Sequence, residues 1–161
     1  MNDPPAASHG TSKSERLRLD LTRSRRLLEE ALRGYRDLGD NLFVARTIGY
    51  LGYVALLRGD LPAARRLFLA SLSGFRQLGE RFGIAEEPQA ISVLSAAEGQ
   101  DGRAAELAGA AHALWDSMSA QPLASDRAIA SGYLDAARRR TGRRSGDRPG
   151  SVGRRWASIR A

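Results

Sequence analysis

Residues 25–40 read RRLLEEALRGYRDLGD, and residues 65–80 read RRLFLASLSGFRQLGE. At an offset of 40 residues the two stretches are identical at eight of 16 positions, including two glycines and three arginines. The turns repeat as well, because Gly59 and Gly99 also lie 40 residues apart. Self-similarity at a period of 20–50 residues is typical of a solenoid built from one repeated unit. An ordinary helical bundle with a coincidental match is the alternative.

Apolar residues recur every three or four positions between these glycines, which predicts amphipathic helices. Aromatic residues make up only 6% of the chain, and Ala and Leu dominate, which favours helix over strand. We therefore expect an all-α fold of antiparallel hairpins. The expected helices are about six in number and cover residues 15–38, 42–58, 62–78, 84–98, 103–118 and 127–140.

Two prolines and one pair of capping residues refine this expectation. Pro62 fits the first turn of the third helix, where a missing N–H costs little. Pro88 should kink the fourth helix or make it restart. Ser12 and Glu15 are spaced to form a capping box at the start of the first helix.

The chain divides into three regions by composition. Residues 1–13 have little apolar content and are expected to be disordered. Residues 14–142 form the helical repeat domain. Residues 143–161 are rich in Arg and Gly, and we expect little order there.

The basic excess of the chain is confined to its end. Residues 1–137 hold 16 Lys and Arg against 17 Asp and Glu, whereas residues 138–161 hold nine Arg and one Asp. The body therefore has no net positive charge to follow a phosphate backbone. A tail that binds nucleic acid or an acidic surface is one interpretation; a disordered tail without a selected role is the other.

Several classes of function are not expected from this composition. There is no cysteine, no apolar run of membrane-spanning length and no signal-peptide pattern at the N-terminus, so we expect a cytoplasmic protein. His9 and His112 are far apart, and we expect His112 to be a partly exposed helix residue rather than a metal ligand. No P-loop and no nucleophile–base constellation is visible. We therefore expect neither an enzyme nor a cofactor.

Two pairs of adjacent acidic residues, Glu29-Glu30 and Glu86-Glu87, could suggest a catalytic dyad. Neighbouring residues of a helix point in different directions, so neither pair converges on one site. We expect both pairs to belong to solvated helix faces.

The spacing within the repeat resembles that of tetratricopeptide repeats. Leu51 and Gly52 stand where that family has a Leu-Gly pair in the first helix of a hairpin. In the second helix, Ala64, Phe68 and Ser71 take its small, aromatic and small positions. Small residues there let two helices approach closely, and the aromatic side chain fills the space between hairpins. The resemblance implies a right-handed solenoid.

The hairpin that follows 40 residues later is degenerate. Ser92 replaces the glycine, and the small and aromatic positions of the second helix are all alanine, at Ala104, Ala108 and Ala111. We expect one well-formed hairpin, at about residues 45–78, followed by this weaker copy.

Three phrases are similar to the C-terminal region of large bacterial ATP-binding transcriptional regulators of the LuxR and SARP types. They are RRLLEEAL…LGD, LGYVALLRGDLPAARRLF and AAELAGAAHALW…SDRAIASGYLDAARRRTG, which together span about residues 15–142. The resemblance implies a protein–protein interaction module that works beside separate ATPase and DNA-binding domains. Its partner would be another protein or those domains. The ending, TGRRSGDRPGSVGRRWASIRA, departs from the family, and we hypothesise a frameshifted reading frame, which the other two frames of the coding DNA would test.

In such an array the first helices of the hairpins line a concave groove. By repeat position, the predicted protein-binding residues are Arg46, Tyr50, Tyr53, Glu86 and Gln89, with Gly49 and Val93 beside them. Tyrosine and arginine are the residues that most often carry binding energy. The alternative is that Tyr50 and Tyr53 pack against the next hairpin. The first helix also has an apolar stripe without a partner on its N-terminal side, which predicts self-association or docking on a larger chain.

Overall fold

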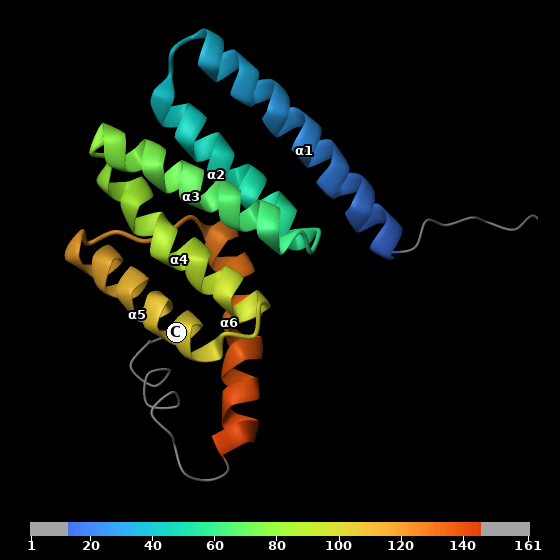
Figure 1. The fold of residues 1–161 in the computed structure, drawn as a ribbon, viewed down its shortest axis with the longest axis vertical. Helices are drawn as coiled ribbons and strands as arrows, with labels where there is room; N and C mark the ends of the chain where they lie inside the picture. Colours follow the sequence, from blue (N-terminus) through green and yellow to red (C-terminus); the bar gives the residue numbers. More distant parts are fainter. Residues whose placement is uncertain (1–12, 146–161) are drawn as a thin grey trace, which may run out of the picture.

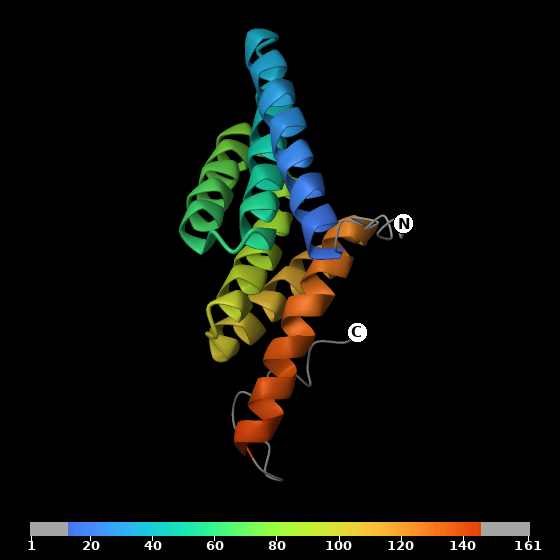
Figure 2. The same cartoon turned by 90° about the vertical axis from the view of Figure 1, so that its right-hand side faces the viewer.

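The computed structural model describes residues 13–145 of the chain, with side chains up to Thr141. This part is all-helical and contains six helices, as predicted. They are α1 (Lys13–Asp37), α2 (Asn41–Leu57), α3 (Leu61–Leu78), α4 (Arg81–Ala97), α5 (Asp101–Ser117) and α6 (Ala124–Ser145). Figure 1 shows α1 to α5 as a row of antiparallel neighbours, and Figure 2 shows α6 running along one side of that row.

The expected bounds of the first five helices agree with the structure to within three residues at each end. Two expectations need correction. Of the two alternatives for Pro88, the restart was wrong, because α4 runs through Pro88 as one helix. α6 begins earlier than expected and continues to Ser145, past the expected end of the repeat domain at residue 142. Ser12 and most of the two expected disordered regions lie outside the described residues.

Four turns in the described part share one geometry at intervals of 20 residues. Their glycines have positive φ angles: 70° at Gly39, 80° at Gly59, 65° at Gly79 and 77° at Gly99. In each turn the next residue donates its N–H to a carbonyl five positions earlier, over 2.8–3.0 Å. This is the Schellman motif, for which glycine is favoured because it has no Cβ to clash. The unit of the array is therefore one helix and one turn.

A fifth turn follows the same spacing with a different residue. Ser119 has a φ of 50°, and the N–H of Ala120 donates to the carbonyl of Trp115 over 3.1 Å. Serine in this left-handed conformation is strained. The periodic turn thus persists here although its glycine is lost.

The first hairpin, α2–α3, is held together by close contacts at glycine. A Cβ at Gly52 would lie 2.7 Å from the ring of Phe68, and a Cβ at Gly74 would lie 2.8 Å from the Cβ of Ala45. Phe68 is only 1% exposed and packs edge-on against Tyr53, with ring centroids 5.1 Å apart. The structure agrees with the expected close approach of the two helices.

The second hairpin, α4–α5, packs through alanine instead. Ala104, Ala105 and Ala108 of α5 form a buried cluster with Ala96 and with Ala137 of α6. α6 is also fixed at its far end, where Arg140 donates to Asp101 Oδ1 over 2.6 Å and to the carbonyl of Ala96 over 2.7 Å. The second hairpin therefore completes its core with a helix from outside itself.

α6 retains a short trace of the repeat in its sequence, because Gly132 and Tyr133 lie 80 residues after Gly52 and Tyr53, which is twice the repeat length. In space, however, α6 packs more on α4 than on α5, so it does not take the place of the first helix of a third hairpin. None of the described helices is both long and apolar enough to cross a lipid bilayer.

Candidate functional site

The structure brings four of the five predicted binding residues together. Arg46, Tyr50 and Tyr53 of α2 and Glu86 of α4 line one small cavity of about 20 Å³, which we call the α2–α4 cavity. The N-terminal part of α6 adds Asp126 to its wall. Gln89 is separated from this group and lines a larger pocket farther along the array.

The two predicted tyrosines occupy different environments. Tyr53 packs against the buried cluster around Phe68, and burial raises the pKa of its hydroxyl far above the ordinary value of 10.0. Tyr50 is only partly buried, and burial raises its pKa less. Packing accounts for the position of Tyr53, whereas Tyr50 keeps part of its surface exposed.

The acidic pair on α4 was assigned wrongly to a solvated face. Glu87 is only 4% exposed, and burial raises its pKa to about 8 in spite of a hydrogen bond with Ser71. Its Oε2 atom is buried without a hydrogen-bond partner. Burial also raises the pKa of Glu86 to about 7, although Arg46 opposes the shift. α4 packs between α6 on one side and α2 and α3 on the other. Both carboxyls point toward α2 and α3.

The α2–α4 cavity is too small to receive a side chain. A volume of about 20 Å³ is close to what one water molecule needs. The raised pKa values of Glu86, Glu87 and Asp126 share one main cause, which is burial of the carboxyls. This cluster is an acidic patch whose carboxyls ionise less readily than exposed ones.

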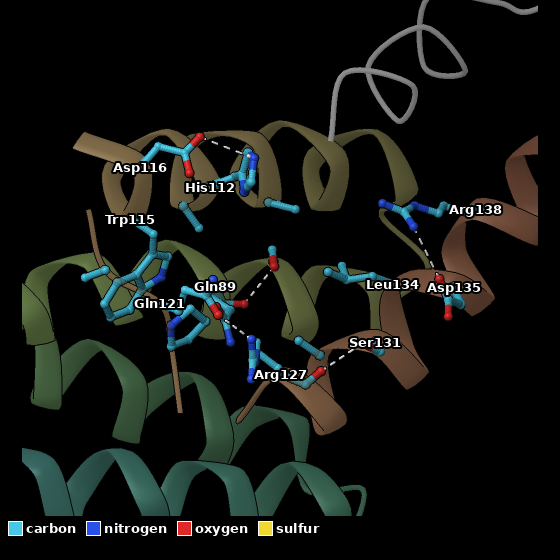
Figure 3. A pocket seen from close by; sticks show the side chains of 16 residues that line it. Gln89, His112, Trp115, Asp116, Gln121, Arg127, Ser131, Leu134, Asp135 and Arg138 are labelled. Atoms are coloured by element: carbon cyan, nitrogen blue, oxygen red, sulfur yellow. Dashed lines mark hydrogen bonds and ion pairs between the residues drawn. The ribbon is translucent and has the colours of Figure 1, made fainter. Parts of the chain in front are cut away.

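The larger pocket has a volume of about 380 Å³ and lies between α4, α5 and α6 (Figure 3). We call it the α4–α6 pocket. In Figure 3, Trp115 and Gln89 lie at one end, and Asp135 and Arg138 of α6 lie at the other. Its apolar lining includes Ala108, Ala111, Trp115, Ala130 and Leu134.

The two cavities are equivalent positions of the repeat. Gly49, Ser71 and Phe75 line the small one, and their counterparts 40 residues later line the large one, namely Gln89, Ala111 and Trp115. Phe68 occupies the middle of the first hairpin, but its counterpart is Ala108. The loss of one aromatic side chain therefore contributes to the larger space.

Polar groups surround the α4–α6 pocket. Arg127 donates to Gln121 Oε1 over 2.6 Å, and Arg138 Nη1 lies 3.4 Å from Asp135 Oδ1. His112 is partly exposed, as predicted, and its Nε2 lies 3.4 Å from Asp116 Oδ2. The indole Nε1 of Trp115 is buried and has no hydrogen-bond partner.

The repeat position predicted that Gln89 and Val93 would face an open groove. In the structure α6 covers this part of the groove. Val93 is fully buried and packs with Ala130 of α6, and Gln89 is 8% exposed. The pocket itself was not predicted. The sequence signal for the pocket was the difference between two equivalent positions, which hold Phe68 in the first hairpin and Ala108 in the second. Among the described residues, no cluster of His, Asp and Glu could hold a metal ion.

Comparison of this chain with protein-family models, with curated proteins and with solved structures finds no match.

Proposed function

We propose that this chain is a non-catalytic protein–protein interaction module whose partner inserts a tyrosine or phenylalanine side chain into the α4–α6 pocket. The module would be the repeat portion of a bacterial transcriptional regulator or signalling ATPase. Support for that wider setting comes from the three phrases that resemble such regulators. Support for the mode of binding comes from the pocket.

The observation that carries the proposal is the exchange of Phe68 for Ala108 at equivalent positions. The first hairpin supplies its own aromatic side chain and leaves about 20 Å³. The second hairpin supplies a methyl group and leaves about 380 Å³, whose lining includes four alanines, Leu134 and Trp115 beside nine polar or charged residues. Apolar pockets of this size are the usual places for a buried anchor residue.

The polar groups favour tyrosine as the anchor. A buried donor without a partner costs about 1–3 kcal/mol, and the Nε1 atom of Trp115 is such a donor. A phenolic oxygen can accept from it, whereas a phenylalanine ring cannot. Arg127 bonds to the neutral amide of Gln121, so that contact does not neutralise its charge. Acidic residues beside the tyrosine would therefore favour binding.

The predicted residues of α2 and α4 would extend the same interface. Tyr50, Arg46 and Glu86 are partly exposed. They line the α2–α4 cavity, which lies one repeat before the α4–α6 pocket. We expect them to contact the flanks of the bound segment, with Gln89 at the anchor itself.

The first experiment uses p-cresol, which has the side chain of tyrosine. The signal is the fluorescence of Trp115 in a chain with Trp156→Phe, so that one tryptophan remains. Titration should change this fluorescence, and Ala108→Phe should abolish the change by filling the pocket. Ala110→Phe on the exposed side of α5 is the matched control and should leave binding unchanged. Equal binding by the Ala108→Phe chain would contradict the proposal.

The second experiment uses the native partner. The intact chain, Ala110→Phe and Ala108→Phe serve as baits in an extract of the source cells. Proteins retained by the first two and lost from the third are pocket-dependent partners. The same proteins on all three baits would show that the pocket is not the binding site.

A nucleic-acid-binding regulator that acts through the basic tail is the alternative, and the nine arginines of residues 138–161 favour it. Its test is deletion of the tail. The deletion must begin at Gly146, because α6 extends to Ser145 and Arg140 anchors it. This deletion removes four of the nine arginines. The interaction module predicts unchanged capture of its partner, whereas the alternative predicts weakened binding to DNA or RNA.

A further inference from the structure

The two halves of α6 are held on the array in different ways. In its first two turns only Asp126 and Ala130 are buried, and Ile129 is partly buried. The second half is fixed by Ala137, which is fully buried, and by Arg140, whose guanidinium donates to a carboxylate of α5 and to a backbone carbonyl of α4. The N-terminal half is therefore the more weakly held of the two, and one of its two buried side chains is a carboxyl.

This carboxyl shares the α2–α4 cavity with a carboxyl of α4. Asp126 and Glu86 both line that space of about 20 Å³. Asp126 accepts a hydrogen bond from its neighbour Ser125 over 3.1 Å. Arg46 lines the same cavity, but its guanidinium lies over the ring of Phe43, 5.7 Å from the centroid, and its Nε atom is buried without a hydrogen-bond partner. Among the described residues, neither carboxyl has a direct ion pair.

The other groups around the cavity do not supply that ion pair. Glu87 also lines it, and its Oε2 atom is buried without a hydrogen-bond partner. Tyr50 and Tyr53 stay neutral, because burial raises the pKa of both hydroxyls above the ordinary value of 10.0. Within the described part of the chain, α5 contributes nothing to the lining. The charged groups beyond the wall of the cavity are Glu80 before α4, Arg76 of α3 and Arg127 of α6, which bonds to Gln121.

The charge on the two carboxyls depends on pH. Asp126 lies in the first turn of α6, where the helix dipole favours its ionised form, although burial raises its pKa. Burial raises the pKa of Glu86 to about 7, with Arg46 opposing this shift and Asp126 adding to it. A carboxyl whose pKa is raised by a contact stabilises that contact at low pH, and the contribution is lost as pH rises through the raised pKa. Above neutral pH, two like charges therefore meet in one cavity.

We propose that α6 is a pH-dependent gate, whose N-terminal half closes on α2 and α4 below neutral pH and moves away above it, when Glu86 and Asp126 repel each other. The half beyond Ala137 stays in place. The moving half carries Arg127 and Ser131, which line the α4–α6 pocket (Figure 3). Opening therefore removes part of the wall of that pocket and would release a bound partner. This release alone rests on the proposed function.

The experiment measures two distances in the full chain by pulsed electron paramagnetic resonance. The chain has no cysteine, so introduced cysteines take spin labels at chosen sites only. One pair, Ala110→Cys with Ala128→Cys, joins α5 to the N-terminal half of α6. The matched pair, Ala110→Cys with Arg139→Cys, joins α5 to the second half. All three sites are exposed.

Both pairs should give one narrow distance at pH 6. At pH 9 the first pair should gain a longer distance, while the second pair stays unchanged. The open fraction should rise by about tenfold, because one unit of pKa shift corresponds to a factor of ten. Circular dichroism at both pH values will show that the labelled chains are folded.

Two variants connect the opening to the carboxyls. Glu86→Gln and Asp126→Asn should each keep the first pair closed at pH 9, because each removes one of the two charges. Glu30→Gln, exposed on α1, is the control and should open like the natural chain. A first distance that is the same at pH 6 and pH 9 would overturn the proposal. So would equal changes in both pairs, or opening that persists undiminished in Asp126→Asn. No partner is present in these samples, so their outcome does not depend on the proposed function.

Discussion

The hairpins α2–α3 and α4–α5 follow one repeat pattern but fill their interiors in different ways. The first places Phe68 over Gly52, and the ring closes the space between its helices. The second has Ala108 and Ser92 at these positions and shares its core with α6 through Ala137. One aromatic residue thus separates a hairpin whose two helices are joined by a ring from one that leaves a pocket. The following predictions test that difference.

The largest effect should come from the aromatic residue itself. Phe68→Ala removes a ring that is 1% exposed and should lower the free energy of unfolding by about 3–5 kcal/mol. Ala108→Phe places the same ring in an existing pocket of about 380 Å³ and should change stability by about 1 kcal/mol or less. Urea unfolding followed by circular dichroism measures both. Equal and large losses would mean that the second hairpin is as tightly filled as the first.

An intermediate effect is expected where the hairpins meet. Glu87 occupies the position that Thr47 has in the first hairpin. The Thr47 hydroxyl is satisfied by the carbonyl of Phe43 at 2.6 Å, whereas Glu87 Oε2 has no partner. Because folding raises the pKa of Glu87 from 4.5 to about 8, its contribution is fully present below pH 4.5 and is lost as pH rises through 8.

Glu87→Gln removes this titration. At pH 9 the variant should be more stable than the natural chain by about 1–3 kcal/mol, and at pH 4 the two should nearly agree. Thermal unfolding across this range measures the difference. Glu86→Gln is the control for the neighbouring carboxyl, whose pKa rises to about 7 and whose effect should therefore be smaller. A difference that does not depend on pH would show that Glu87 is charged in the folded protein throughout.

The smallest effect concerns the turns that end the two hairpins. The first ends at Gly79 with a φ of 65°, and the second ends at Ser119 with a φ of 50°. Ser119→Gly should raise stability by about 0.5–1 kcal/mol by removing left-handed strain, and Gly79→Ala should lower it by about 1 kcal/mol. Differential scanning calorimetry can resolve both. If Ser119→Gly were destabilising, its side chain would have to hold the turn in another way.

The helices could be predicted from the sequence because their signals are local. Apolar spacing and the closing glycines identified five helices to within three residues at each end. The 20-residue spacing of Gly39, Gly59, Gly79 and Gly99 was present but was interpreted only as a 40-residue hairpin repeat. Ser119 could not be recognised as part of the series, since serine rarely adopts a positive φ.

The site was harder to predict, because it depends on where α6 lies. The repeat position brought Arg46, Tyr50, Tyr53 and Glu86 together correctly around one cavity. It could not show that α6 covers Val93, nor that Glu87 would be turned inward. The surroundings of Val93 are set by α6, which begins some 30 residues later in the chain, and the carboxyl of Glu87 is turned toward Ser71 of α3. Local spacing carries no information about such a contact.

The order in which the helices touch one another has a kinetic consequence. Apart from the contacts of α6 with α4 and of α2 with α4, each described helix packs on its immediate neighbours in the chain, and α1 packs on α2 alone. Contacts between nearby segments need little loop closure, so such topologies fold quickly for their size. Opening of the native state should begin at α1, which is held on one side only, and amide hydrogens there should exchange before those of α4.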